Sequence, residues 1–241
     1  MLDRLFPDLR ERYAGPELMD LPDVNEKKLI NTIRQFSLLN ILFTRSRRLI
    51  KKYILADMLQ SPERTYEFLD LGAGGCDIAI WLLNRCKLLG LDIRITCLDY
   101  DLSIVKYARE KCRGYSEIRV IELSVAELDK LAPYDYVFAN HLLHHLPAAQ
   151  WSMLIAALIK QTRRIFLLND IRRSYWAYAG FALFAGIFMH NSFAFADGLL
   201  SIRKGISVQE MRRAVSACGH KNNITIGSIL PARVFVLGQM Q

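Results

Sequence analysis

A strand that turns through glycines into a helix is the feature that most constrains how this chain folds. Residues 67–80 read Glu-Phe-Leu-Asp-Leu-Gly-Ala-Gly-Gly-Cys-Asp-Ile-Ala-Ile, and an amphipathic helical pattern follows the glycines. Glycine lets the backbone approach a ligand closely, and the free N–H groups at a helix start attract a negative group. This order of elements predicts the first unit of a nucleotide-binding α/β sheet.

The charges around the glycine turn indicate which kind of nucleotide fits. A dinucleotide site requires the pattern G-x-G-x-x-G, and here Gly72 and Gly74 match while Asp77 stands at the third glycine position. A carboxylate there would repel a pyrophosphate at the helix start. Asp70, just before the glycines, favours a cationic ligand instead. We therefore expect a ligand with an ammonium, a sulfonium and no phosphate, such as S-adenosylmethionine.

A second acid follows at the spacing expected for a ribose contact. Asp99 ends the predicted strand 93–98 and lies 25 residues after Gly74. A carboxylate at that strand end can accept hydrogen bonds from both ribose hydroxyls. The alternative is a surface aspartate in a turn, because Asp101 follows closely. Given the glycines upstream, we predict the ribose role.

The segment after the third predicted strand, residues 117–123, is expected to contact the adenine ring. In this fold the ring usually lies between apolar side chains with one polar contact. Val125 and Ala126 could pack against it, and Ser124 or Glu127 could contact its amino group. No acid in this segment stands clearly at the position expected for the polar contact to adenine.

Three histidines follow the predicted strand 134–139 within five residues: His141, His144 and His145. A zinc site is one interpretation, but no cysteine or acid accompanies them at ligand spacing, so we expect no metal. His144 or His145 could act as a general base facing a methyl acceptor. The alternative is a capping or packing role.

Three motifs in this order make the chain resemble the class I S-adenosylmethionine-dependent methyltransferases, in the small-molecule branch that includes quinone-biosynthesis enzymes. The motifs are residues 69–75, the acid Asp99 and residues 135–146, and the resemblance covers roughly residues 65–170 and the C-terminal tail. It departs from the family at Cys76, where many members have a third glycine. It also departs at the His144-His145 pair, where some relatives have an acid and a histidine, so the acidic partner is missing.

The resemblance implies a set of cofactor contacts. Asp70 and the backbone of Gly72 would hold the methionine end, and Asp99 would hold the ribose. Asn140 and His141 would line the wall near the methyl group. The predicted cofactor site also includes Ala73 in the glycine turn and Tyr100 after Asp99.

The predicted fold is a Rossmann-like, seven-stranded, mostly parallel sheet with helices on both faces and a final antiparallel hairpin. Residues 61–241 would form the methyltransferase domain, and residues 1–60 an N-terminal arm and helical cap. The acidic segment 1–22 is expected to be a loosely ordered arm that folds over the site. The hairpin strands are expected at 223–229 and 233–237.

A hydrophobic insertion is predicted at about residues 172–205. Its segment 174–196 has no formally charged residue, and glycines and polar residues interrupt it. The length of this segment is near the ~20 residues needed to span a bilayer. We favour a buried helix that roofs the acceptor pocket over a lid that also touches a membrane, and both over a spanning helix. The first two imply a hydrophobic acceptor, aromatic or polyketide-like.

The excess positive charge lies in two flanks of the chain. Residues 27–60 carry eight Lys and Arg against one acid, and residues 162–241 carry ten against three. Solvated helix faces are one interpretation, and a surface for anionic lipid, nucleic acid or an acidic substrate is the other. The five cysteines form no C-x-x-C pair and the chain starts without a signal-peptide pattern. We therefore expect a cytoplasmic protein, with peripheral membrane contact as an option.

The function predicted from the sequence is S-adenosylmethionine-dependent O-methylation of a phenolic, quinone-like or polyketide acceptor in secondary metabolism. One alternative is an RNA (tRNA or rRNA) methyltransferase, suggested by the basic flanks. Residues 139–142 lack the Asn/Asp-Pro-Pro-aromatic motif with which base methylators hold a flipped base, so nucleic acid is disfavoured. The other alternative is a cofactor-binding module without turnover, and the oligomeric state stays open.

Overall fold

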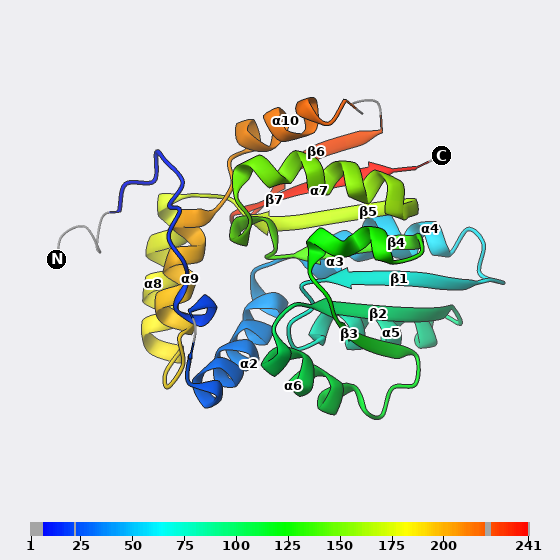
Figure 1. The fold of residues 1–241 in the computed structure, drawn as a ribbon, viewed down its shortest axis with the longest axis horizontal. Coiled ribbons are helices and arrows are strands. Elements are labelled where there is room, and N and C mark those ends of the chain that lie inside the picture. Colours follow the sequence, from blue (N-terminus) through cyan, green and yellow to red (C-terminus); the bar gives the residue numbers. More distant parts are fainter. Residues whose placement is uncertain (1–6, 22, 220–222, 241) are drawn as a thin grey trace.

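A computed structural model describes residues 7–21, 23–219 and 223–240, and it contains one seven-stranded mixed sheet (Figure 1). The strand order is β3-β2-β1-β4-β5-β7-β6, in which β7 runs antiparallel between β5 and β6 and the other neighbours are parallel. The strands are β1 (Thr65–Leu71), β2 (Asp92–Asp99), β3 (Ile118–Glu122), β4 (Tyr134–Asn140), β5 (Thr162–Ile171), β6 (Ile224–Ile229) and β7 (Arg233–Gln239). The predicted fold is confirmed.

Helices cover both faces of the sheet, which explains why its central strands are apolar on both sides. The helices that pack on the sheet are α3 (Ser46–Ile50), α4 (Ala56–Met58), α5 (Asp77–Leu88), α6 (Leu102–Cys112), α7 (Ala148–Gln161) and α10 (Val208–Ala217). The first four share one buried cluster with one face of the sheet, and α7 and α10 share a second cluster with the other face. A π-helical turn (Lys51–Leu55) joins α3 to α4.

Side-chain caps set the starts of two helices that pack on the sheet. Asp101 precedes α6 and accepts from the backbone N–H groups of Ser103 and Ile104 at 2.8 and 3.0 Å. Ser207 and Glu210 form a capping box at the start of α10. Two short 3-10 turns, η3 (Val125–Lys130) and η4 (Leu143–His145), follow β3 and β4.

The remaining elements lie beside the carboxyl ends of the parallel strands (Figure 1). The N-terminal arm, residues 7–21, contains the short turn η1 (Leu18–Asp20) and leads toward α2 (Glu26–Leu42). Between β5 and α10 the chain forms α8 (Tyr175–Phe188) and α9 (Ala194–Lys204), so the apolar segment 174–196 is divided between two helices. Across the described ranges, no helix combines the length and the apolar character that crossing a bilayer requires.

Candidate active site

A cavity of about 1000 Å³ lies at the carboxyl ends of the parallel strands. Ligands of open α/β sheets bind outside these strand ends, where the strand order reverses, here between β1 and β4. The arm, α2, α8 and α9 provide the other walls. The cavity therefore combines backbone from the sheet with side chains from the two ends of the chain.

The glycine turn after β1 forms part of the cavity wall. Gly74 has a φ of +52°, and a Cβ built on it would meet no atom within 4 Å, so a side chain here would point into open space. Cys76 also has a positive φ, +56°, which explains why many relatives of the predicted family have glycine at this position. Its side chain is buried in the core beside the sheet, so Cys76 adopts the turn without entering the cavity.

Asp99 braces this turn from the end of β2. Its Oδ2 accepts from the backbone N–H of Gly74 at 3.0 Å, and its Oδ1 accepts from that of Asp101 at 3.2 Å. Asp99 and Tyr100 both line the cavity. Each carboxylate oxygen can accept more than one hydrogen bond, so Asp99 keeps the capacity to bind ligand hydroxyls.

Two further acids lie near the turn, and burial raises the pKa of both. Asp70 is buried and does not reach the cavity wall, whereas Asp77 lines it. The pKa of Asp70 rises well above its usual value, first through burial and then through the charges of Asp77 and Asp99. A cationic ligand bound beside these carboxyls would favour their charged forms.

Asn140, at the end of β4, is held by hydrogen bonds from several side chains. Its Oδ1 accepts from the Arg233 guanidinium at 2.9 Å, the Ser46 hydroxyl at 3.0 Å and the Asn169 amide at 3.1 Å. Its Nδ2 donates to Asn40 Oδ1 at 2.9 Å. The side chain is on the cavity wall, and its orientation is decided by partners from four other segments.

His141 follows Asn140 with a φ of +59° and also lines the cavity. Burial, followed by the charge of Arg233, lowers its pKa well below the usual value, so the imidazole is neutral. Its Nε2 accepts from Arg233 Nη1 at 3.2 Å, which places the ring proton on Nδ1. His141 is therefore a hydrogen-bond donor at Nδ1 and has no free ring nitrogen to act as a base.

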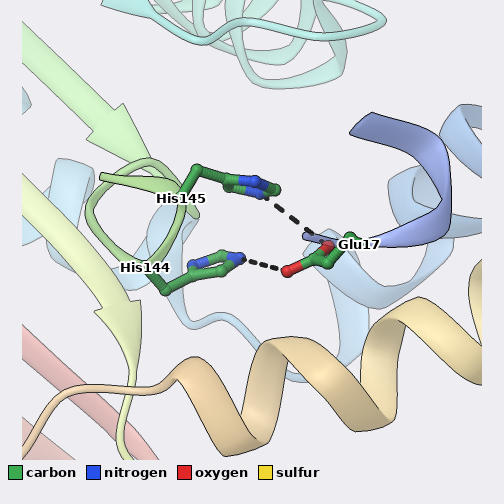
Figure 2. Close-up of side chains that lie close together, drawn as sticks. All are labelled: Glu17, His144 and His145. Carbon is green, nitrogen blue, oxygen red and sulfur yellow. Dashed lines mark ion pairs between the residues drawn. The ribbon is translucent and has the colours of Figure 1, made fainter. Parts of the chain in front are cut away.

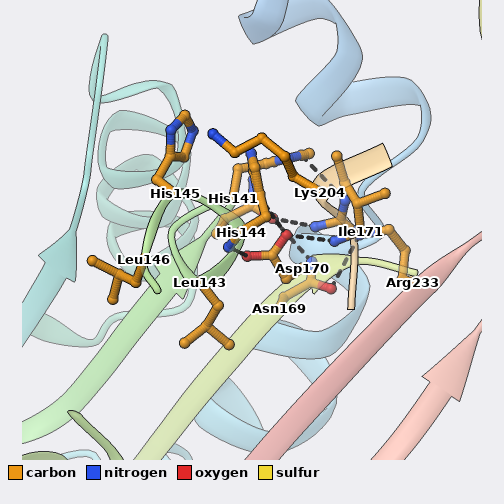
Figure 3. A network of polar contacts seen from close by, with 12 residues as sticks. His141, Leu143, His144, His145, Leu146, Asn169, Asp170, Ile171, Lys204 and Arg233 are labelled. Carbon is orange, nitrogen blue, oxygen red and sulfur yellow. Dashed lines mark hydrogen bonds and ion pairs between the residues drawn. The ribbon is translucent and has the colours of Figure 1, made fainter. Parts of the chain in front are cut away.

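His144 is paired with Asp170 (Figure 3), so the expectation that an acidic partner is missing was wrong. Its Nδ1 lies 2.7 Å from Asp170 Oδ1, and its backbone N–H donates to Asp170 Oδ2 at 3.2 Å. Burial acts to raise the pKa of Asp170, but the charge and hydrogen bond of His144 outweigh it and keep that pKa below its usual range. The acid comes from β5, which neighbours β4 in the sheet.

The arm supplies a second acid to the histidines (Figure 2). Glu17 is 0% exposed, and its two oxygens lie 3.6 Å from His144 Nε2 and 4.0 Å from His145 Nε2. Lys204, the last residue of α9, places its ammonium 3.3 Å from Glu17 Oε1. Neither Glu17 oxygen has a hydrogen-bond partner within the described part of the chain.

Of the two histidines in η4, His145 has the more solvent-exposed side chain, and it lines the cavity. Its Nδ1 lies 3.1 Å from Asp20 Oδ2, again from the arm. Burial acts to lower its pKa, but the hydrogen bond of Asp20 and the charge of Glu17 outweigh it and raise that pKa. His145 therefore favours the charged imidazolium form.

Acids thus accompany the histidines, contrary to the spacing argument against a metal. Two groups of side chains lie close enough together to hold a metal ion. The first group is Glu17, His144 and His145, and the second is His141, His144 and Asp170. In the second group the Nδ1 of His144 is already hydrogen-bonded to Asp170, and in the first Lys204 already pairs with Glu17. The absence of a metal stays a prediction.

The segment predicted to contact adenine lies only partly on the cavity wall. Ser124 and Val125 line the cavity, whereas Ala126 and Glu127 do not. Glu127 instead closes a capping box, because its carboxylate accepts from the backbone N–H of Ser124 at 3.3 Å, and it also pairs with Lys130.

Sequence reasoning missed several residues that the fold brings to the site: Glu17, Asp20, Asn40, Ser46, Asn169, Lys204 and Arg233. Most come from the arm, the first helices and the last strand, outside the segment that carries the motifs. Only Asp170 gave a signal, as an acid at the end of a strand beside the histidine loop.

Comparisons with known proteins agree with this geometry. Residues 68–164 match the model of a family described as methyltransferase domain. No curated protein matches the chain in sequence. Magnesium protoporphyrin IX methyltransferase from Synechocystis PCC 6803, solved with bound SAH, is 14% identical with a TM-score of 0.54, covering 95% of this chain and 91% of its own.

Two other solved structures share the fold at similar distance. The plantazolicin methyltransferase BamL, in complex with a substrate analogue and SAH, is 11% identical with a TM-score of 0.59, and the match covers 88% of this chain and 85% of that one. The CurJ carbon methyltransferase is 15% identical with a TM-score of 0.61, and the match covers 90% of this chain and 61% of that one.

Proposed function

Because residues 68–164 match the model of the methyltransferase domain family and the chain has the fold of the class I S-adenosylmethionine-dependent methyltransferases, we propose that it methylates an oxygen of a hydrophobic small molecule. The chain is a methyltransferase, and S-adenosylmethionine is its cofactor. The observation that carries the proposal is that the Asp99-braced glycine turn and the Asp170–His144 pair face one cavity.

The cofactor contacts are proposed from the wall that the sheet provides. The backbone of Gly72 to Gly74 and the carboxyl of Asp77 would hold the methionine end of the cofactor. The carboxyl of Asp70, buried behind this wall, would add negative charge when a cation is bound. Asp99 would accept from the ribose hydroxyls, and Val125 would pack against the adenine ring. When bound, the cofactor supplies a methyl group on a sulfonium.

An apolar wall supports a hydrophobic acceptor. Aromatic residues of α2 and α8 line the cavity opposite the sheet, and they are Phe36, Phe43, Trp176, Phe181 and Phe184. The rings of Phe43 and Phe184 meet edge to face with centroids 5.1 Å apart. We therefore propose residues 1–60 as a cap and 172–205 as a lid, which exclude water and align the acceptor. Two solved neighbours are named for small-molecule substrates, magnesium protoporphyrin IX and plantazolicin.

The Asp170–His144 pair supports base-assisted transfer to an oxygen. With its Nδ1 proton held by Asp170, His144 presents the lone pair of Nε2. Nε2 would take the proton of an acceptor hydroxyl while the oxygen bonds to the methyl carbon. The carbon–sulfur bond breaks with its electrons left on sulfur, so the products are a methyl ether and neutral S-adenosylhomocysteine. The resulting imidazolium would be stabilised by Asp170.

The first test is cofactor binding, measured by calorimetry. We expect the protein to bind S-adenosylmethionine and Asp99→Ala to weaken that binding by about 10- to 100-fold, because charge-assisted hydrogen bonds contribute about 1.5–3 kcal/mol. Glu122→Ala is the matched control, since Glu122 is an exposed acid that pairs in register with Asp99. No binding by the unmodified protein, or equal effects of both substitutions, would contradict the proposal.

A further inference from the structure

Glu17 is the buried charge that the proposed mechanism does not use. Its carboxylate is fully buried, and within the described residues neither oxygen accepts a hydrogen bond. A buried carboxylate without hydrogen bonds is costly unless paired charges compensate. Lys204 supplies a compensating charge, with its ammonium 3.3 Å from Glu17 Oε1. The Nε2 atoms of His144 and His145 lie 3.6 and 4.0 Å from the two carboxylate oxygens (Figure 2).

These three groups belong to the body of the enzyme, whereas Glu17 belongs to the arm. His144 and His145 lie in η4 after β4, and Lys204 ends α9. Lys204 is 5% exposed, and its only other ion pair among the described residues is with Asp20 of the arm, at 3.9 Å. Without the arm, the body of the enzyme would present a buried ammonium beside two imidazoles. The ammonium can donate to an oxygen while Nε2 of His144 accepts its proton, so the group fits a hydroxyl that ionises.

The Glu17 carboxylate also occupies the place that the proposed reaction assigns to the acceptor. It faces His144 Nε2, the nitrogen that Asp170 leaves free to take a proton. A hydroxyl that gives its proton to this nitrogen must come within about 2.6–3.2 Å of it. Glu17 Oε1 lies at 3.6 Å, so the acceptor oxygen and the Glu17 carboxylate cannot both be there.

Polar contacts that can be exchanged for water hold the arm on both sides of Glu17, and Leu9 and Met19 of the arm add apolar contacts with two small buried clusters. Arg12 donates to the backbone carbonyls of Lys204 at 2.8 Å and Leu146 at 2.9 Å. The backbone N–H groups of Leu18 and Met19, which follow Glu17, donate to the Asp197 carboxylate at 2.6 and 3.0 Å. The arm therefore closes over the site without a large apolar interface next to Glu17.

We propose that Lys204, His144 and His145 form the binding site for an acidic hydroxyl of the acceptor, and that Glu17 fills this site until the acceptor displaces it. The proposal rests on the proposed function and narrows the acceptor to phenols or enols on an apolar body. Lys204 would stabilise the oxyanion that forms as His144 takes the proton, by a charge already in position. Displacement of Glu17 would couple acceptor binding to movement of the arm.

The test uses 4-nitrophenol as the probe, because its phenolate absorbs visible light and reports ionisation directly. It is titrated into the full chain with S-adenosylhomocysteine present, beside 4-nitroanisole, which has the same body but no acidic hydroxyl. We expect Glu17→Ala to bind 4-nitrophenol about tenfold more tightly than the unmodified protein and to increase the bound phenolate fraction. Binding of 4-nitroanisole should change by less than about twofold. These fold-changes are order-of-magnitude expectations for removing one competing charge.

Two further substitutions separate charge from shape. Glu17→Gln removes the charge at nearly constant volume and should change 4-nitrophenol binding in the same direction, which decides the question if Glu17→Ala does not fold. Lys204→Met combined with Glu17→Ala should abolish the gain in phenolate while keeping 4-nitroanisole binding. Glu11→Ala is the matched control, since Glu11 is an exposed acid of the same arm.

Three results would overturn the proposal. The first is unchanged 4-nitrophenol binding in both Glu17 variants, and the second is an equal gain for 4-nitroanisole, which would mean that only space was opened. The third is a phenolate signal that does not depend on Lys204. Binding of S-adenosylmethionine, measured on the same variants, should stay unchanged, so loss of this inference remains distinct from loss of the proposed function.

Discussion

At the scale of single residues, the hydrogen-bond partners assign different chemistry to three histidines of one loop. Arg233 donates to the Nε2 of His141 and keeps that ring neutral. Asp170 holds the Nδ1 of His144, which leaves Nε2 for proton transfer. His145 has a raised pKa because acids of the arm outweigh its burial. The loop therefore places three side chains of one residue type in three different hydrogen-bonding environments.

His144→Gln tests the base. We expect methyl transfer to a phenol to fall by about 10²- to 10⁴-fold in kcat, the usual contribution of a positioned base, while S-adenosylmethionine binding is unchanged. Steady-state kinetics with labelled cofactor measure the first, and calorimetry measures the second. His190→Gln, at an exposed histidine, is the control. A kcat within about threefold of the unmodified enzyme would exclude His144 as the base.

At the scale of elements, α9 attaches the arm through a buried carboxyl. Asp197 is fully buried and accepts from two successive backbone N–H groups of η1. Burial raises its pKa to about 6, and the charges of Glu17 and Asp20 add to that rise. The contact between the arm and α9 therefore changes its charge near pH 6.

This carboxyl predicts a pH dependence of stability. Between about pH 4 and pH 6 the folded protein keeps the Asp197 proton that the unfolded chain, with an ordinary pKa of 3.8, has lost. The free energy of unfolding should therefore fall with rising pH across this window and level off above it. Asp197→Asn should remove that component, as measured by urea unfolding from pH 4 to pH 8.

The control for this prediction is Asp129→Asn, at an exposed aspartate of η3. Other acids of the protein titrate in the same range, so the informative quantity is the difference between each variant and the unmodified protein at every pH. If Asp197→Asn and Asp129→Asn give the same difference, the attachment of the arm does not depend on the charge of Asp197.

At the scale of the whole molecule, α8 lies at an edge away from the sheet (Figure 1), and several of its apolar side chains are exposed. Trp176 is 89% exposed and Leu183 is 71% exposed, and Ile187 lies one turn further along the same helix. Trp176 also lines the cavity, so this face lies beside a cavity wall. The arrangement supports a peripheral contact with membranes from which a lipophilic acceptor would enter.

Binding to vesicles tests this contact. With vesicles of phosphatidylcholine and phosphatidylglycerol, we expect the fluorescence of Trp176 to shift to the blue as its ring leaves water, and Trp176→Phe to remove most of the shift. Leu183→Asp should weaken co-sedimentation by about tenfold or more, because a buried leucine contributes about 1.5–3 kcal/mol. Met153→Asp on α7 is the matched control, also 71% exposed. Equal binding of both variants, or dimers that bury α8 in solution, would contradict the membrane contact.

The positions of the strands along the chain and the glycine turn could be predicted from the sequence because both depend on local signals. Alternating and continuous apolar runs mark strands, and the left-handed backbone at Gly72 and Gly74 requires the residue type found there. The same local reasoning placed Asp99 at a strand end. The same reasoning also predicted that Ala126 and Glu127 contact the adenine ring, but neither lines the cavity. Glu127 instead caps its own turn, a role that a polar residue at this place can equally have.

Contacts between distant segments were decided by the tertiary structure alone. The sequence by itself determined a class I methyltransferase fold, a glycine turn and a loop with three histidines. Only the sheet order placed Asp170 beside His144, 26 residues away along the chain, and only the folding of the arm placed Glu17 before the same ring. The physical reason is that periodicity and turn chemistry act over a few residues, whereas the partner of a buried charge is chosen by how whole elements pack.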